Sequence, residues 1–326
     1  MPTERHSGPI VVIGSLNMDL VCRTEQIPQP GQTILGSDFV TIPGGKGANQ
    51  AVAAAKLLAA ASRMQVVMIG RVGDDDFGQR LLNGLKLHKV RSDRVIITEG
   101  VASGVAMILV DKMGENSIVV APGANAHLMP ADIDAAESVI RTASVVVLQL
   151  EIPLATVQHA IAMCQRLGIH TILDPAPVPP TGLTRAMFGV DLLTPNQGEA
   201  ERLLDLEPTH NIRTRKIVDP KQIAMDLLAR GPKAVVLKLG NRGAMLLDRA
   251  GEIEQIKPHK VAAVDTTASG DAFTAALAVG HAEGRTLIES ARFANAAGAL
   301  CCTGFGAQPS LPGREAVEKL LAETPG

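Results

Sequence analysis

The sequence predicts an α/β protein built on a doubly wound, mainly parallel β-sheet. Short apolar runs alternate along the chain with longer segments of helical pattern, and this alternation is typical of consecutive βαβ units. With 46% apolar residues, the 326-residue chain can bury a large core. We therefore expect a single α/β domain over residues 1–326, with helices on both faces of the sheet and ligands at the carboxyl ends of its strands.

Six apolar runs are the expected strands. Each is short, and most are rich in Val, Ile and Leu, which suits a parallel strand buried on both faces. In chain order they are residues 10–14, 66–69, 145–148, 171–173, 191–194 and 234–237. Polar residues or glycine follow several of them, so the strand ends should carry the functional groups. These are Asn17 and Asp19, then Glu151, then Asn196, and finally Gly240.

The expected helices lie between and after these strands. Their ranges are close to residues 46–60, 77–88, 153–166, 196–205, 219–230, 270–283 and 286–301.

Two segments depart from this rhythm, at about residues 20–42 and 100–120. Both have strand-like alternation and turn signals, which indicates a small inserted sheet. Such a sheet could form a lid over a ligand site, or it could be a pair of exposed hairpins with no moving role. No internal repeat or low-complexity segment appears.

The segment from Asp265 to Asp271 is the most informative stretch of the chain. Its small residues Ala268, Ser269 and Gly270 precede an apolar helical run, so they should form a loop and first turn at a helix N-terminus. The free N–H groups of such a turn bind anions, and Asp271 could accept a proton from an attacking hydroxyl. Asp271 could instead only cap the helix while Gly270 makes a tight turn.

A second glycine-rich segment runs from Pro43 to Ala55 and also leads into a helical run. Its glycines directly adjoin Lys46, and Ala48 follows Gly47, so the segment is neither a Walker A loop nor a GxGxxG fingerprint. Lys46 and Asn49 on the first helical turn could hold a polyhydroxylated ligand. A plain loop-to-helix junction is the alternative.

Together with Asn17-Met18-Asp19, these segments resemble the ribokinase branch of the ribokinase-like (PfkB) sugar kinase family. The resemblance spans nearly the whole chain, which makes a chance match hard to sustain. Further matching segments are Gly114–Ser117, Ala121–Ala126, Leu148–Pro153, Asp174–Pro177 and Gly306–Ser310. The resemblance implies a doubly wound fold with a β lid, ATP as co-substrate, and transfer of the γ-phosphoryl group of MgATP to O5 of D-ribose.

For the sugar, the resemblance implies contacts from six residues besides Asp271. Carboxylate and amide side chains suit vicinal hydroxyls, and buried carboxylates need such partners. Glu151 could also be only a charge near a helix N-terminus. The implied sugar-binding residues are Asn17, Asp19, Gly45, Lys46, Asn49 and Glu151.

For the nucleotide and its metal, the resemblance implies an Asn-x-x-Glu motif at Asn196 and Glu199. Glu199 would organise the waters of Mg²⁺ without direct ligation, although a capping box would produce the same spacing. Lys238 departs from the family, because many relatives carry Thr there. The implied ATP-binding residues are Asn196, Lys238, Gly240, Gly243, Gly270 and Asn295.

The resemblance also implies K⁺ as a monovalent activator beside the anion-binding turn. Its ligands would be mostly backbone carbonyls, with side-chain oxygens from Asp265 and Ser310. The matching positions are Asp265, Thr267, Cys301, Gly304, Gly306 and Ser310. Asp174 and Ser269 are further departures, because relatives usually have Asn at the first position and Gly or Ala at the second.

The resemblance implies that Asp271 is the general base and that the amides of residues 268–271 stabilise the transferred phosphoryl group. A kinase for deoxyribose, fructose, a keto-deoxy acid or a nucleoside is the enzymatic alternative. A sugar or nucleotide sensor without turnover is the alternative from another class. The expected partners are small molecules, with a homodimer formed through the β lid.

Composition and charge bear on partners and location. The chain has no Trp or Tyr, six Phe and a net charge of −2, which argues against a nucleic-acid partner. Its four cysteines lack CxxC or metal-ligand spacing, so we expect reduced thiols and a cytoplasmic protein. Residues 1–9 lack an apolar signal region, and no apolar run is long enough to suggest a membrane span.

Overall fold

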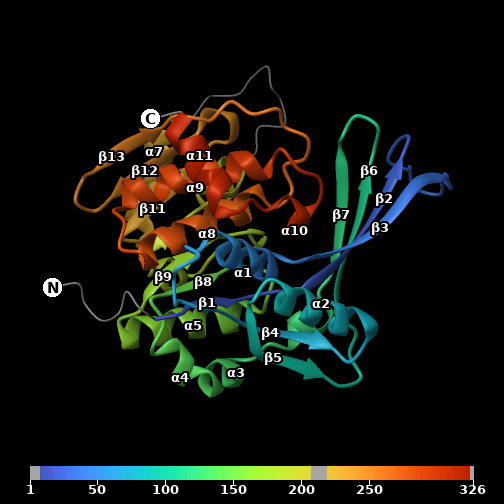
Figure 1. Ribbon diagram of the computed structural model, residues 1–326, viewed down its shortest axis with the longest axis horizontal. Coiled ribbons are helices and arrows are strands. Elements are labelled where there is room, and N and C mark those ends of the chain that lie inside the picture. Colours follow the sequence, from blue (N-terminus) through green and yellow to red (C-terminus); the bar gives the residue numbers. More distant parts are fainter. Residues whose placement is uncertain (1–7, 207–218, 324–326) are drawn as a thin grey trace.

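The computed structural model of the protein describes residues 8–206 and 219–323 (Figure 1). Within these residues, nine strands form one sheet in the order β13-β12-β11-β10-β9-β8-β1-β4-β5. Neighbouring strands from β5 to β11 are parallel, whereas β12 and β13 are antiparallel. The six expected strands and the mainly parallel sheet are confirmed. The bounds are β1 (Ile10–Ile13), β4 (Val66–Gly73), β5 (Arg91–Thr98), β8 (Val145–Leu148), β9 (His170–Leu173), β10 (Leu192–Leu193), β11 (Ala234–Lys238), β12 (Ala244–Asp248) and β13 (Ile253–Ile256).

Helices cover both faces of this sheet because successive strand residues point to opposite sides. Ile10 and Val12 of β1 face one core, whereas Val11 and Ile13 face the other. The first core is closed by α1 (Lys46–Leu57), α2 (Asp76–Leu87), α8 (Ser269–Ala282), α9 (Leu287–Cys301) and α11 (Arg314–Glu323). The second is closed by α3 (Pro130–Ala135), α4 (Glu137–Ile140), α5 (Leu154–Leu167), α6 (Gln197–Leu203) and α7 (Pro220–Arg230). The seven expected helices are thus confirmed.

The strand order reverses at β1. The chain continues from β1 to β4 on one side, and later returns to place β8 on the other side. A crevice therefore opens beyond the carboxyl ends of β1 and β8, which is where doubly wound sheets bind ligands.

A second sheet of four strands, called the small sheet below, projects from the side of the main body (Figure 1). Its order is β3-β2-β6-β7, and it corresponds to the two segments that departed from the βαβ rhythm. The Arg23 guanidinium lies 4.5 Å from the centre of the Phe305 ring, which ties the small sheet to the main body. The bounds are β2 (Asn17–Thr24), β3 (Gly36–Gly44), β6 (Gly104–Val110) and β7 (Asn116–Ala121).

Asn17 and Asp19 follow β1, as expected, and they lie within the first residues of β2. The turn after β1 is short, so the chain enters the small sheet almost at once. These two side chains therefore belong to both the crevice and the base of the small sheet.

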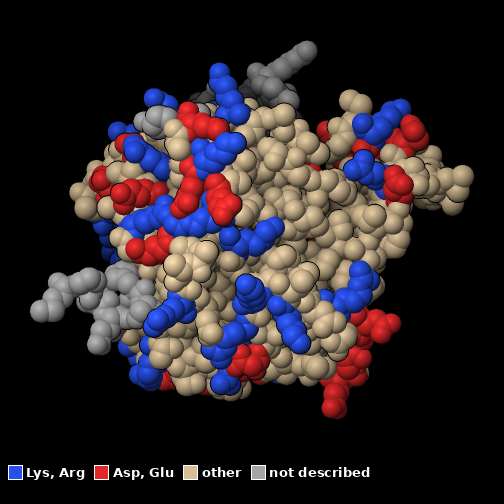
Figure 2. Space-filling view, viewed as in Figure 1, with Lys and Arg blue, Asp and Glu red and all other residues tan. Residues whose placement is uncertain are grey.

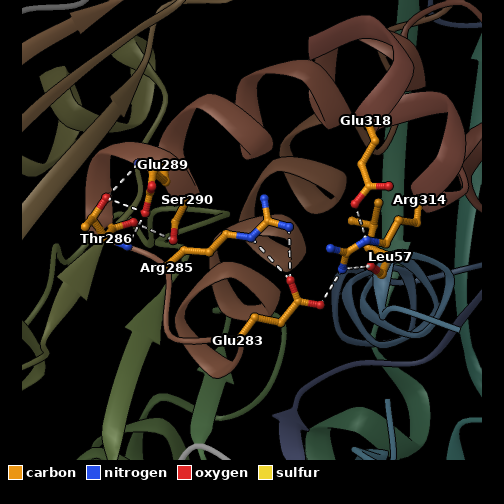
Figure 3. Close-up of polar contacts among 8 residues, drawn as sticks. All are labelled: Leu57, Glu283, Arg285, Thr286, Glu289, Ser290, Arg314 and Glu318. Carbon is orange, nitrogen blue, oxygen red and sulfur yellow. Dashed lines mark hydrogen bonds and ion pairs between the residues drawn. The ribbon is translucent and has the colours of Figure 1, made fainter. Parts of the chain in front are cut away.

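The α8–α9 corner is fixed at the end of α8 away from the crevice (Figure 3). Glu283 follows α8 and pairs with Arg285 at 3.1 Å and also with Arg314 of α11. Thr286 and Glu289 form a capping box that begins α9. These contacts join α8, α9 and α11 at the end of α8 opposite Asp271.

Acidic and basic side chains lie in small groups of both signs on the face shown in Figure 2. Among residues 8–206 and 219–323, no helix combines the length and apolar character needed to span a bilayer. The four cysteines are free thiols.

Candidate active site

The two sides of the crevice meet at Glu151. This residue follows β8, and its Oε2 accepts hydrogen bonds from Ser15 Oγ at 2.6 Å and from the Lys46 amide at 3.1 Å. Ser15 follows β1, and Lys46 is the first residue of α1. The nearest helix after Glu151 begins only at Leu154. Glu151 therefore bridges the crevice, and its carboxylate also lies at the N-terminus of α1, so the alternative of a charge near a helix N-terminus stays open.

Glycines let α1 approach this crevice closely. Gly45, the residue before α1, has φ of 87°, and a Cβ there would lie 2.6 Å from the Asn17 amide nitrogen. A Cβ at Gly47 would lie 2.6 Å from the Ser15 amide nitrogen. A side chain at either position would push α1 away. The second glycine segment is thus a close-packed part of the crevice as well as a loop-to-helix junction.

Asn17 and Asp19 face the crevice from β2 with different surroundings. Asn125 Nδ2 donates to Asn17 Oδ1 at 2.8 Å, and the same amide group also bonds the main chain of Leu16. The Asp19 side chain, in contrast, has no hydrogen-bond partner among the described residues. Burial, followed by the charges of Glu151 and Asp271, raises the pKa of Asp19 to about 7, although Lys46 opposes this shift.

Asp271 is a buried carboxylate in the first turn of α8. Asn49 Nδ2 donates to its Oδ2 and Gln50 Nε2 to its Oδ1, both at 3.0 Å. Burial raises the pKa of Asp271; Lys46 opposes this, and Asp174 adds to it. The residue before α8 is Ala268, with no side-chain cap. The alternative that Asp271 only caps the helix is therefore wrong.

The small residues ahead of Asp271 form the expected turn. Ala268 adopts a left-handed conformation with φ of 61°, which directs the chain into α8. The Ser269 amide donates to Thr266 O at 3.2 Å. Within the described residues, the amides of Gly270 and Asp271 have no hydrogen-bond acceptor. These two N–H groups at the positive end of α8 are available to an anion.

Two cavities meet at this turn. One of about 560 Å³ is lined by five of the predicted nucleotide residues, namely Lys238, Gly240, Gly243, Gly270 and Asn295. The other, of about 470 Å³, lies between the small sheet and the main body and is lined in part by Asp19. Ala263 and Thr266 line both cavities. A larger cavity of about 820 Å³ surrounds Arg185, Arg230 and Arg249 and contains none of the predicted site residues.

Asn196 and Glu199 do not line the first cavity, but Asn196 lies next to Lys238, which does. Glu199 Oε2 accepts from the Asn196 amide at 2.7 Å, and Asn196 Oδ1 accepts from the Glu199 amide at 2.8 Å. The capping box offered as an alternative is therefore present. Burial raises the pKa of Glu199. Asn196 pairs with Lys238 in an isolated parallel bridge, which brings the motif to the cavity wall.

The residues expected around a monovalent cation come together. Asp265 Oδ1 accepts from Thr267 N at 2.9 Å and Oγ1 at 2.7 Å, and its Oδ2 accepts from Gly306 N at 2.9 Å. Cys301 Sγ lies 3.6 Å from Thr267 O and 3.1 Å from Ser310 Oγ. A Cβ at Gly304 would lie 2.9 Å from Ser310 Cβ. The carbonyl-rich loop is thus packed against the anion-binding turn.

Four polar side chains of the site were missed by the sequence reasoning. Ser15, Gln50 and Asn125 support predicted site residues through side-chain hydrogen bonds, and Gln149 in turn supports Gln50. Asn125 and Gln149 lie in segments that carried the family resemblance, Gln50 adjoins Asn49, and Ser15 lies two residues before Asn17. Their roles were missed because their hydrogen-bond partners lie far away in sequence.

Comparison with known proteins decides the family. A family model described as "pfkB family carbohydrate kinase" matches residues 8–314. The chain belongs to the pfkB carbohydrate kinase family. Within this family it is 40% identical over 314 residues to a ribokinase of Bacillus subtilis, covering 96% of this chain and 99% of that one. It is 34% identical to a deoxyribokinase of Salmonella typhi, with coverage of 96% and 98%.

The fold of the chain is also similar to that of a solved structure. Arabidopsis thaliana ribokinase complexed with ribose and ATP superposes with a TM-score of 0.85 at 34% identity. The match covers 97% of this chain and 99% of that chain. The fold of this pfkB-family kinase is therefore that of the ribokinases.

Proposed function

We propose that this pfkB-family kinase is a ribokinase, which transfers the γ-phosphoryl group of ATP to O5 of D-ribose. The observation that carries the proposal is the place of Asp271. Its carboxylate is bonded to Asn49 on the sugar side, while its own amide and that of Gly270 point from α8 beside the nucleotide cavity. The proposed base and the amides that would bind the phosphoryl group thus lie in the same turn, the first turn of α8.

The sugar would lie in the crevice between β2, α1 and Glu151. Asp19 carries an ionisable carboxylate without a protein donor, and Asn49 Oδ1 is a buried acceptor without a partner in the described chain. Both need hydroxyl donors, and a sugar with vicinal hydroxyls supplies them. The other residues proposed to contact the sugar in this crevice are Asn17, Gly45, Lys46 and Glu151.

In the reaction, Asp271 would take the proton of the attacking O5 hydroxyl. The raised pKa of its buried carboxylate favours proton acceptance. The amides of Gly270 and Asp271 would then stabilise charge on the transferred phosphoryl group. Burial lowers the pKa of Lys46, but nearby carboxylates, Asp271 first, more than offset this, so Lys46 stays cationic beside the base.

The side chains fit the expected ions. Mg²⁺ bound with ATP neutralises phosphate charge, and the buried carboxylate of Glu199 suits an outer-sphere role toward its waters. The residues proposed to hold the nucleotide are Asn196, Lys238, Gly240, Gly243 and Asn295.

The residues proposed for K⁺ suit a large monovalent cation, because they are rich in oxygen. They are Asp265, Thr267 and Ser310, with the backbone of Gly304 and Gly306, and Cys301 contacts Thr267 and Ser310. Such an ion would order the loop that precedes α8.

ADP release with MgATP and a panel of sugars tests this function. We expect turnover with D-ribose that rises when K⁺ replaces a larger organic cation. 2-Deoxyribose is the main competitor, because the Salmonella typhi relative is a deoxyribokinase. Turnover on deoxyribose, fructose or adenosine but not on ribose would overturn the sugar assignment. Sugar binding without ADP release would favour a sensor.

We also propose that the small sheet is a lid and that its outer face joins two copies of the chain. The register places Met107 beside Leu20 on β2 and Val119 on β7, and places Phe39 beside Cys22. Phe39, Met107 and Val119 are 64%, 50% and 59% exposed. Such an apolar sheet face is stabilised by a second copy.

Sedimentation velocity of Met107→Glu tests the homodimer. A carboxylate at the centre of this face should shift the protein from dimer to monomer, because an unpaired charge is costly in an apolar interface. Lys112→Glu, on the exposed turn after β6, serves as the charge control. A wild-type monomer at micromolar concentration, or a dimeric Met107→Glu variant, would contradict the proposal.

A further inference from the structure

Between the two halves of the crevice lies a buried ion pair of Lys238, which is proposed above only to hold the nucleotide, and Asp174, which has no role in the proposed reaction. Lys238 Nζ is 2.8 Å from Asp174 Oδ1, and the two side chains are 12% and 2% exposed. Lys238 ends β11, and Asp174 follows β9, so both come from carboxyl ends of the main sheet. A pair this deeply buried gains little net stability, because desolvation of both charges offsets their attraction.

The ammonium of this pair faces the place where a phosphoryl group would be transferred. Lys238 lines the 560 Å³ cavity together with Gly270. A Cβ at Gly270 would lie 3.4 Å from Lys238 Nζ, so the ammonium is adjacent to the anion-binding turn of α8. The main chain of Lys238 is also held, because its amide donates to Pro195 O at 2.8 Å.

The carboxylate of the pair is connected to the base. Gln50 Nε2 donates at 3.0 Å both to Asp174 Oδ2 and to Asp271 Oδ1. Gln149 Nε2 donates to Gln50 Oε1, which fixes the orientation of the Gln50 amide. One carboxylate oxygen of Asp174 thus contacts the Lys238 ammonium at the nucleotide cavity, and the other accepts a hydrogen bond from the Gln50 amide that also contacts Asp271.

We propose that Asp174 is a positioning residue that holds Lys238 as a catalytic ammonium for the phosphoryl group and, through Gln50, sets the orientation of Asp271. This inference rests on the proposed kinase function and assigns roles to two residues of its site. With ATP bound, Lys238 contributes positive charge beside the phosphoryl group, close to the anion-binding turn of α8. Asp174 keeps the ammonium at that point, so no reorganisation is needed when charge develops.

If the Lys238–Asp174 pair had only a structural role, a different result would be expected. Removing one member leaves a buried unpaired charge, which destabilises the protein, whereas removing both restores stability. If the pair only supports the fold, the double variant also recovers activity. If Lys238 acts on the phosphoryl group, the double variant recovers stability but not activity.

The experiment compares Lys238→Met, Asp174→Asn and the double variant. For Lys238→Met and for the double variant, we expect kcat/KM for MgATP to fall about 100-fold, the size typical for loss of one preorganised charge donor. Asp174→Asn should lower kcat about tenfold, because the ammonium remains but is no longer held. The melting temperature should fall in each single variant and recover in the double variant.

A matched control pair lies at the other end of β11. Lys233 pairs with Asp191 at 2.6 Å, away from the crevice. Lys233→Met should leave kcat/KM for MgATP unchanged. Activity in the double variant within about threefold of wild type would overturn the inference.

Titration with the magnesium complex of AMP-PNP separates this inference from the sugar assignment. Lys238→Met should weaken its binding without any sugar present. If wild type binds the analogue but does not phosphorylate ribose, the proposed function fails while the Lys238 contact is still tested. Unchanged analogue affinity in Lys238→Met would contradict the contact itself.

Discussion

Replacing Asp271 by Asn is expected to lower kcat about 10³-fold, within the range measured when a positioned general base is removed. The variant keeps the shape of the side chain but cannot accept the O5 proton. Asp271 receives hydrogen bonds from Asn49 and Gln50, and neither amide can replace it as a base. The affinity for ribose should change by no more than a few fold, because the six other residues proposed to contact the sugar remain.

Ribose binding by calorimetry, together with ADP release, measures the two effects separately. Asp191→Asn is a suitable control, because this aspartate lies directly before β10, at the amino ends of the strands and away from the crevice. The control should retain the turnover of wild type. Near-normal kcat in Asp271→Asn would remove Asp271 from the mechanism, and an equal loss of ribose affinity would assign it to sugar binding instead.

The sheet and its helices could be predicted because their signals are local. Buried parallel strands such as β1 and β8 are continuous apolar runs, and helices such as α8 follow small residues that form a helix N-terminus. Strands β5, β12 and β13 were missed. β5 lies at an edge and begins with Arg91 among charged residues, and β12 and β13 form an antiparallel pair outside the βαβ rhythm.

The candidate site could be predicted to the extent that its residues lie in motifs. The resemblance pointed to Asp271 and Glu151, which lie at a helix N-terminus and after a strand end. It gave no sign that Asp174 pairs with Lys238, because 64 residues separate them. Gln50 likewise shares its amide between carboxylates more than 120 residues away in sequence. Such contacts depend on which strands become neighbours, and no local pattern encodes that order.

Replacing Asp19 by Ala is expected to raise KM for ribose about 100-fold or more while leaving KM for MgATP nearly unchanged. A site that binds sugar through hydrogen bonds to its hydroxyls loses much of its affinity when one acceptor is removed, because the hydroxyl of the bound sugar is then left buried without a partner. Asp19 has no protein donor of its own in the described chain, so its carboxylate depends on the sugar. Arg23→Ala, four residues along β2, is a control for disturbance of the small sheet.

The pH dependence of ribose binding tests the same carboxylate without a mutation. Burial, Glu151 and Asp271 raise the pKa of Asp19 to about 7 in the free protein. Below about pH 7 Asp19 is protonated and loses acceptor capacity, so KM for ribose should rise as the pH falls. Bound ribose favours the charged form, so binding near pH 6.5 should release protons, and calorimetry in buffers of different ionisation enthalpy measures them. Asp19→Asn should abolish this release, whereas release that persists in Asp19→Asn would assign the titration to Asp271, whose pKa burial also raises.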